Sequence, residues 1–255
     1  MEVKSLLLED GLNISYVGKD LDQGALPALF YFALSGQESL GLDPYNQPIA
    51  FLADYPMRLF SLSLPFHGAE IPPTEALVYW ADEIAKGHNL IEEFVGQVKR
   101  AFDKLTELGV ILPGQVGVAG LSRGAFIACH VAAKIPEMQT ILGFAPLSEL
   151  TYAKEFHALI NTPLAKSLGL HTLTDALATR TLRFYIGNVD TRVGTSLAFQ
   201  FVDQLAHTAL HKGIRSPKIE MIIGPSIGHQ GHGTSKAVFE QGAAWMADQL
   251  KVTHV

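Results

Sequence analysis

Short apolar runs alternate with longer amphipathic stretches along most of the chain. Two of these stretches show helical spacing of apolar residues, from Leu90 to Leu105 and from Phe239 to Leu250, and a third, residues 124–136, is apolar on nearly every side. Near-continuous apolar strands that alternate with helices predict a mostly parallel central sheet with helices on both faces. The runs that read as buried strands cover residues 26–34, 57–64, 114–121, 140–147, 182–189 and 218–225.

The length and composition favour one folded domain. A chain of 255 residues with 48% hydrophobic and 17% charged residues fits a single α/β domain over residues 1–255, and no linker or repeat interrupts it. Residues 148–180, about thirty in number, lie between two predicted strands and contain one or two small helices, as a short lid-like insertion would.

The charge pattern narrows the classes of partner. The formal net charge is −6, from 19 basic and 25 acidic residues, and no cluster of Lys or Arg stands out, so we expect neither nucleic acid nor an anionic membrane as a partner. The single cysteine excludes an internal disulfide and a Cys-based zinc site. No uncharged apolar run approaches the ~18 residues of a membrane span, and a soluble cytoplasmic protein is expected.

The motif Gly-Leu-Ser-Arg-Gly places Ser122 between a predicted strand and a predicted helix. In parallel sheets, ligands bind beyond the carboxyl ends of the strands, so this corner is where chemistry is expected. Small residues at Gly120 and Gly124 allow the tight strand-to-helix turn of a nucleophile, and the helix N-terminus supplies backbone N–H groups for an oxyanion. We therefore interpret Ser122 as a nucleophile rather than an ordinary turn serine.

A serine nucleophile needs a base and an orienting acid, and the chain offers both after later strands. Asp190 follows the strand at 182–189 by way of the sequence Gly-Asn-Val-Asp. The last strand ends near Gly224 and is followed by two histidines, His229 and His232. The short Pro-x-x-Gly-His arrangement favours His229 as the base, with His232 as the second choice. Two histidines three residues apart, without a third ligand nearby, do not predict a metal site.

Together these motifs resemble the α/β-hydrolase superfamily, and within it the branch of dienelactone hydrolases and prolyl-oligopeptidase-like proteins. The motifs that carry the resemblance are GLSRG, GNVDTRV and GPSIGH. The resemblance implies a triad of Ser122, Asp190 and His229, and it implies that no metal or organic cofactor is required. It also places the N–H of Arg123 and an amide of Ser35 or Gly36 in the oxyanion hole, although this chain has Ser-Gly where the family usually has His-Gly.

Three functions remain after these observations. The leading hypothesis is a serine hydrolase, a carboxylesterase, that cleaves an ester or related acyl bond of a small-molecule substrate through an acyl-enzyme. A small prolyl-oligopeptidase-like peptidase or a thioesterase is the nearby alternative. A non-catalytic ligand-binding protein on the same fold is the third, because a fold alone does not determine function. The sequence does not indicate the substrate's identity or the oligomeric state.

Overall fold

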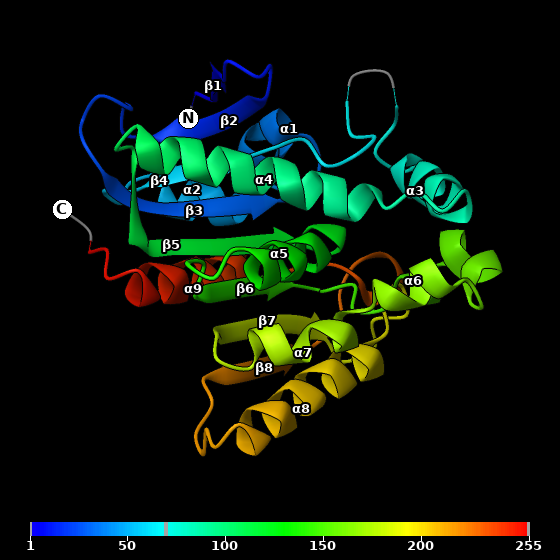
Figure 1. Cartoon of the computed structure of the whole chain (residues 1–255). Helices are drawn as coiled ribbons and strands as arrows, with labels where there is room; N and C mark the ends of the chain where they lie inside the picture. The colour runs from blue at the N-terminus through cyan, green and yellow to red at the C-terminus, as the bar shows by residue number, and fades with distance from the viewer. Residues whose placement is uncertain (1, 69–70, 254–255) are drawn as a thin grey trace.

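The structure is a computed structural model that describes residues 2–68 and 71–253. In these residues the strands form one eight-stranded sheet in the order β1-β2-β4-β3-β5-β6-β7-β8 (Figure 1). Strand β2 runs antiparallel to β1 and β4, and every other neighbouring pair is parallel. The strands are β1 (Lys4–Leu7), β2 (Asn13–Gly18), β3 (Leu26–Phe32), β4 (Arg58–Ser61), β5 (Ile111–Leu121), β6 (Thr140–Phe144), β7 (Thr181–Gly187) and β8 (Ile219–Gly224).

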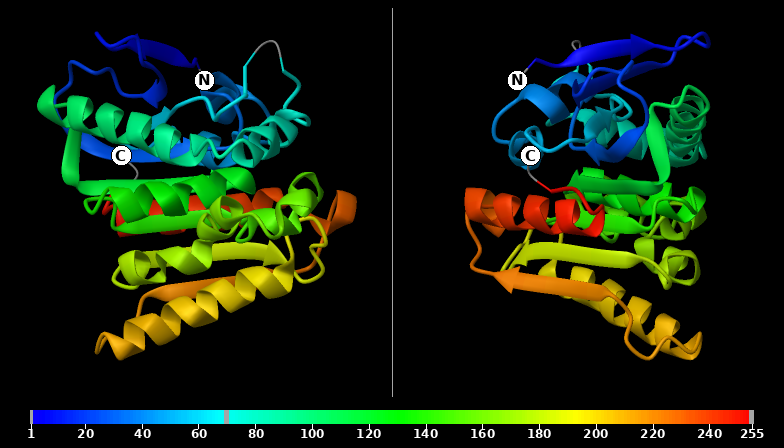
Figure 2. Two further views of the ribbon diagram at one scale, coloured as in Figure 1. Left: turned by 45° about the vertical axis from the view of Figure 1, so that its right-hand side comes forward. Right: turned by 90° about the vertical axis from the view of Figure 1, so that its left-hand side faces the viewer.

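Helices cover both faces of this sheet, and the edge-on view in Figure 2 separates the two layers. One layer contains α3 (Ala76–Ala85), α4 (Leu90–Glu107), α5 (Arg123–Lys134) and α8 (Thr195–His211). The opposite layer contains α1 (Gly36–Gly41), α2 (Gln47–Leu52) and α9 (Lys236–Gln249).

Alternate side chains of the central strands feed two separate hydrophobic cores. In β3, Phe30 and Phe32 pack into the core beneath α4 and α5, whereas Leu29 and Tyr31 pack into the core beneath α9. A strand buried on both faces needs apolar residues at every position, which is why the sequence reads as continuous apolar runs. The predicted parallel sheet with helices on both faces is confirmed.

The six predicted strands correspond to β3 through β8, mostly with tighter bounds than the apolar runs. The pattern did not predict β1, which lies at the edge of the sheet and alternates half-buried with exposed residues, or β2, which carries the polar residues Asn13 and Ser15. It also did not predict α8. The helices expected at 90–105, 124–136 and 239–250 correspond to α4, α5 and α9.

The segment between β6 and β7 is built from short helical turns. These are η1 (Leu150–Tyr152), η2 (Lys154–Leu159), α6 (Pro163–Ser167), η3 (Leu170–Leu173) and α7 (Thr174–Leu177). The role of residues 148–180 as a lid-like insertion stays a prediction. Among the described residues, no helix combines the length and the apolar character that crossing a membrane requires.

Candidate active site

Ser122 lies at the corner between β5 and α5, as the motif predicts. Its backbone has φ 56° and ψ −115°, a left-handed conformation that is rare for a residue with a side chain. The N–H of Ser122 donates to the carbonyl of Phe144 at 2.8 Å, and its own carbonyl accepts from Ala125 at 3.0 Å. These backbone bonds hold the strained turn in place between the end of one strand and the first turn of a helix.

The two glycines of the motif allow β5 and α5 to approach each other. A Cβ atom at Gly120 would lie 2.1 Å from the carbonyl carbon of Gly124, and one at Gly124 would lie 1.8 Å from the carbonyl oxygen of Phe32. Both contacts are with backbone, which cannot rotate away as a side chain can. The glycines are therefore required by close packing around the Ser122 corner.

Asp190 is buried in the loop after β7, with its side chain fully inaccessible to solvent. Its Oδ1 accepts from the N–H groups of Arg192 at 2.9 Å and Val193 at 3.1 Å, which fixes the plane of the carboxyl group. The N–H of Asp190 donates to Thr195 at 3.0 Å. The other oxygen, Oδ2, is left for a partner from another loop.

That partner is His232 and not His229. The preference for His229 as the base, drawn from the sequence, therefore disagrees with the geometry of the structure. The Nδ1–H of His232 donates to Asp190 Oδ2 at 2.7 Å, and its Nε2 accepts from the Ser122 hydroxyl at 2.9 Å. His229 lies on the wall of the same cavity and is exposed, and its ring makes no hydrogen bond to either residue. Ser122, Asp190 and His232 therefore form one continuous hydrogen-bonded chain.

The backbone of the last loop explains why the second histidine reaches the serine. Gly228 and Gly231 both have positive φ, so the chain turns twice between the end of β8 and His232. Gly231 passes so close to the preceding loop that a Cβ there would lie 2.1 Å from the carbonyl oxygen of Val189. The carbonyl of Gln230 accepts from the N–H of Thr191 at 2.9 Å. The loop that carries Asp190 and the loop that carries His232 are thus bonded to each other.

The backbone N–H groups that were expected to bind an oxyanion differ in their hydrogen bonds. The N–H of Arg123 lies in the first turn of α5, where the helix itself offers no acceptor. The N–H of Ser35, however, donates to the Glu38 carboxylate at 3.3 Å, and that of Gly36 donates to Ser63 at 3.0 Å. Ser35 is the N-cap of α1, and this capping role directs its amide into the helix.

A cavity of about 570 Å³ opens beside Ser122 and His232. A volume of this size is typical of pockets that hold small molecules. The loop after β3 contributes apolar residues to its wall. The segment after β6 and the loop that carries Asp190 contribute charged side chains. The lining residues are Ala33, Leu34, Tyr45, Thr74, Leu121, Ser122, Arg123, Lys154, Glu155, Arg192, His229, Gln230, His232 and Gly233.

One charged pair in this wall was not assigned any role from the sequence. The guanidinium of Arg192 donates to both carboxylate oxygens of Glu155, at 2.9 and 3.0 Å, and the Glu155 side chain is only 6% exposed. The pair joins η2 to the loop that carries Asp190. Its only sequence signal is that Arg192 belongs to the Asp190 motif, because nothing in the spacing links it to residue 155.

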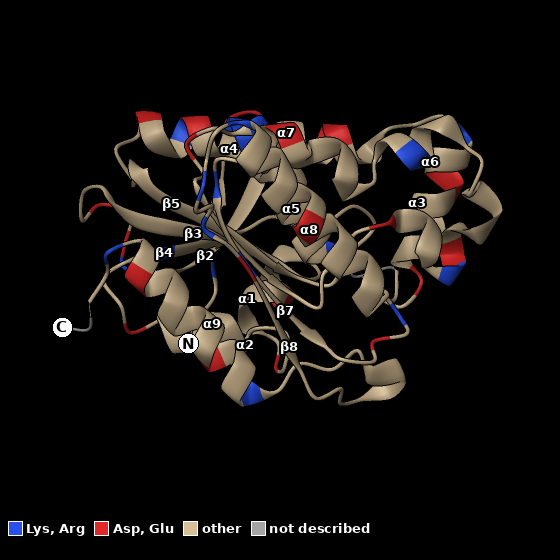
Figure 3. Ribbon diagram, turned by 90° about the horizontal axis from the view of Figure 1, so that it is seen from below, with Lys and Arg blue, Asp and Glu red and all other residues tan. Residues whose placement is uncertain are grey.

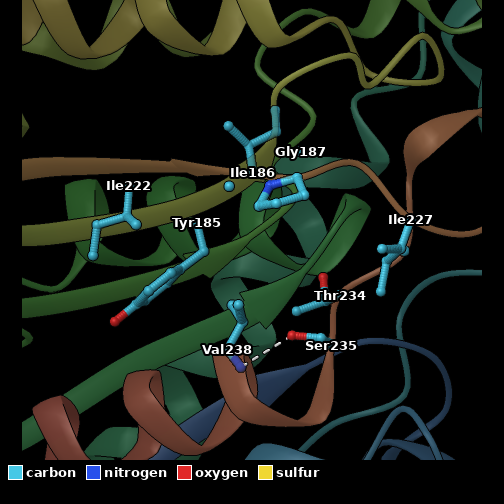
Figure 4. Close-up of a pocket in the computed structure, with 11 residues that line it drawn as sticks. Tyr185, Ile186, Gly187, Ile222, Ile227, Thr234, Ser235 and Val238 are labelled. Atoms are coloured by element: carbon cyan, nitrogen blue, oxygen red, sulfur yellow. Dashed lines mark hydrogen bonds between the residues drawn. The ribbon is translucent and has the colours of Figure 1, made fainter.

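A smaller cavity of about 200 Å³ lies on the other side of the last loop, between β7, β8 and the start of α9 (Figure 4). Tyr185, Ile222 and Val238 make its wall largely apolar. It contains no serine–histidine pair, so it is not the candidate active site. Within residues 2–68 and 71–253, no group of three His, Cys, Asp or Glu side chains is arranged to hold a metal ion.

Comparisons with known proteins give structural matches only. No protein-family model matches the sequence, and neither does any curated protein. TT1662 from Thermus thermophilus superposes with a TM-score of 0.69 at 17% identity, covering 98% of this chain and 99% of the other. The Pyrococcus furiosus esterase Pf2001 gives 0.62 at 17% identity, covering 98% and 91%.

The third comparison is with a much longer protein. Prolyl oligopeptidase B from Galerina marginata superposes with a TM-score of 0.66 at 18% identity over 99% of this chain, which spans 37% of that protein. The strand order, the position of Ser122 after β5 and these superpositions agree with the expectation from the three motifs. The chain has the α/β-hydrolase fold.

Proposed function

We propose that this protein is a serine hydrolase that cleaves carboxylic esters through an acyl-enzyme. The observation that carries the proposal is the chain of two hydrogen bonds from Ser122 through His232 to Asp190, at 2.9 and 2.7 Å. A serine hydroxyl is a weak nucleophile until a base accepts its proton. The arrangement supplies that base and an acid that orients it.

In the proposed mechanism, Ser122 Oγ attacks the acyl carbon while His232 Nε2 takes the hydroxyl proton. Asp190 holds the Nδ1–H tautomer of His232 and stabilises the imidazolium that forms. The tetrahedral intermediate collapses when the imidazolium returns the proton to the leaving alcohol, which leaves Ser122 acylated. Water then attacks the acyl group with His232 again as base, and the free acid and Ser122 are released.

Negative charge on the tetrahedral intermediate needs hydrogen-bond donors next to Ser122. We assign the N–H of Arg123 to this role, because it lies directly after the nucleophile and the helix offers it no acceptor. The N–H groups of Ser35 and Gly36 are already bonded, so we do not assign them. The N–H of Leu34, which also lines the cavity, already donates to Ser39 at 2.9 Å, so we do not assign it either.

An ester is the bond class we favour over a peptide. The esterase Pf2001 matches this chain over nearly the full length of both proteins, whereas this chain spans 37% of prolyl oligopeptidase B. The cavity beside Ser122 has the size of a small-molecule site. We infer a small acyl ester as the substrate class.

The test is the hydrolysis of p-nitrophenyl esters with acyl chains of two to ten carbons. We expect turnover of at least one ester by the wild-type protein and a loss of at least about a thousandfold in kcat for Ser122→Ala. The matched control is Ser63→Ala, another serine near the same sheet edge, which should keep measurable turnover. Equal rates for wild type and Ser122→Ala, or no turnover of any ester, would overturn the proposal.

A further inference from the structure

The cavity beside Ser122 carries more positive than negative charge. It is lined by three cations, Arg123, Lys154 and Arg192, and by one carboxylate, Glu155. The whole chain has a formal net charge of −6, and Figure 3 shows basic and acidic residues interspersed on the helices. The excess of cations at this one place therefore runs against the charge of the protein as a whole.

Two of these charges cancel. Arg192 and Glu155 form a bidentate pair at 2.9 and 3.0 Å, with Glu155 nearly inaccessible to solvent. A guanidinium whose parallel N–H groups already bind a carboxylate in this way has its charge neutralised and its preferred geometry satisfied. Arg192 is therefore not the group that would bind an incoming anion.

Arg123 has no such partner. Its Nη1 donates to the carbonyl of Pro73 at 2.8 Å and to Nε2 of His67 at 3.0 Å. The Nδ1–H of His67 donates to the carbonyl of Pro65 at 2.9 Å, which leaves Nε2 as the acceptor. Burial, together with the charge of Arg123, lowers the pKa of His67 to about 4, so this imidazole is neutral at pH 7.

Both acceptors of Arg123 are therefore uncharged. Burial lowers the pKa of Arg123 to about 10, which still leaves the guanidinium positive at neutral pH. In the described part of the chain Arg123 forms no ion pair, and its Nε and Nη2 make no hydrogen bond. A half-buried cation with free N–H donors in a cavity is a binding group for an anion, because a carboxylate supplies both the missing charge and the missing acceptors.

We propose that the ester substrate carries a carboxylate group and that the side chain of Arg123 binds this group beside Ser122. The proposal rests on the serine hydrolase function above and names its substrate class. Lys154, which is exposed at the rim and has no ion pair in the described residues, adds to the attraction of an anionic substrate.

The first experiment compares matched esters on the wild-type protein. The acyl side is probed with phenyl 4-carboxybenzoate against phenyl 4-carbamoylbenzoate, and the alcohol side with 4-carboxyphenyl acetate against 4-carbamoylphenyl acetate. Each kcat/KM is divided by the rate constant of alkaline hydrolysis of the same ester. We expect the carboxylate to be favoured by about 10- to 100-fold in at least one pair, and the preference to shrink when the salt concentration is raised to 0.5 M.

The second experiment removes the charge. In Arg123→Gln, the ratio of kcat/KM between carboxylate and carbamoyl esters should fall to near one. Arg100→Gln is the matched control: it loses the same charge from the exposed surface of α4, where Arg100 pairs with Asp10, and it should keep the wild-type ratio. The inference would be overturned if carboxylate esters were turned over no faster than carbamoyl esters in both pairs, or if neither kind of ester were turned over.

Labelling with an uncharged fluorophosphonate tests the proposed hydrolase function separately from the inference about Arg123. Labelling of Ser122 by that reagent depends on the nucleophile and not on substrate charge. If Ser122 is labelled while the ester pairs show no charge preference, the inference about Arg123 fails and the hydrolase function stands. If Ser122 is not labelled, the hydrolase function itself fails.

Discussion

Ser122 owes its position to a backbone conformation that most residues avoid. A non-glycine residue with φ 56° and ψ −115° stores strain of about 1–3 kcal/mol, which the surrounding bonds must offset. Its N–H bond to Phe144 and the carbonyl bonds to the first turn of α5 do so. The Ser122 hydroxyl therefore faces His232 without any change in the backbone of Ser122.

Replacing each of the two loop histidines tests which of them serves as the base. We expect His232→Ala to lower kcat for ester hydrolysis by at least about a thousandfold, because the Ser122 proton then has no acceptor. His229→Ala should lower kcat by less than about tenfold, because this ring only lines the cavity. Steady-state kinetics on one p-nitrophenyl ester decides, and a larger loss in His229→Ala than in His232→Ala would contradict the geometry.

The positions of Ser122 and Asp190 could be read from the sequence because each directly follows a strongly apolar strand. The choice between His229 and His232 could not, because both lie in one glycine-rich loop and the two left-handed glycines decide which ring turns back. The ion pair between Arg192 and Glu155 could not be predicted from the sequence either. It depends on how a segment without long helices folds over the sheet edge, which no periodicity encodes.

At the level of secondary-structure elements, the site depends on how closely α5 approaches β3 and β5. Gly120 and Gly124 are the contact points, and a side chain at either would overlap backbone atoms. The strands from β3 to β7 were predictable because they are apolar and mostly buried on both faces, and the edge strand β8 was predictable because it is mainly apolar. The edge strand β1 and its neighbour β2 were not, because a short strand that contains polar residues resembles a loop in sequence.

A glycine comparison measures the tightness of that approach. Gly124→Ala should reduce the free energy of unfolding by at least about 3 kcal/mol, because its Cβ would lie 1.8 Å from the Phe32 carbonyl oxygen. Gly96→Ala, in the middle of α4 with no atom nearer than 4.0 Å to the added Cβ, should increase stability by about 0.5–1 kcal/mol. Urea denaturation of both variants is the measurement, and a stable Gly124→Ala protein would show that the corner is looser than described.

For the whole molecule, one buried and one half-buried histidine link stability to pH. His67 follows β4 and binds Arg123, whereas His130 lies in α5 and donates from Nε2 to the Leu168 carbonyl at 3.0 Å. Burial lowers the pKa of each to about 4, from an ordinary value of 6.5. Between these two values the unfolded chain binds protons that the folded chain does not, so stability rises with pH across this window.

We therefore expect full stability above about pH 6.5 and a progressive loss as pH falls toward 4. Each histidine accounts for about 2 kcal/mol of the loss between pH 7.5 and pH 5. Urea unfolding at both pH values measures the change, and His130→Gln, which keeps a donor for Leu168, should shrink it by about that amount. A wild-type protein equally stable at both pH values would contradict the neutral state of these rings.

The proposed function requires that His232 makes Ser122 reactive. The most direct measurement is the rate at which an uncharged fluorophosphonate becomes attached to the protein, with the modified peptide identified by mass spectrometry. We expect one equivalent of label on Ser122, none in Ser122→Ala, and a rate slowed at least about a hundredfold in His232→Ala. Attachment to another residue, or an unchanged rate in His232→Ala, would contradict it.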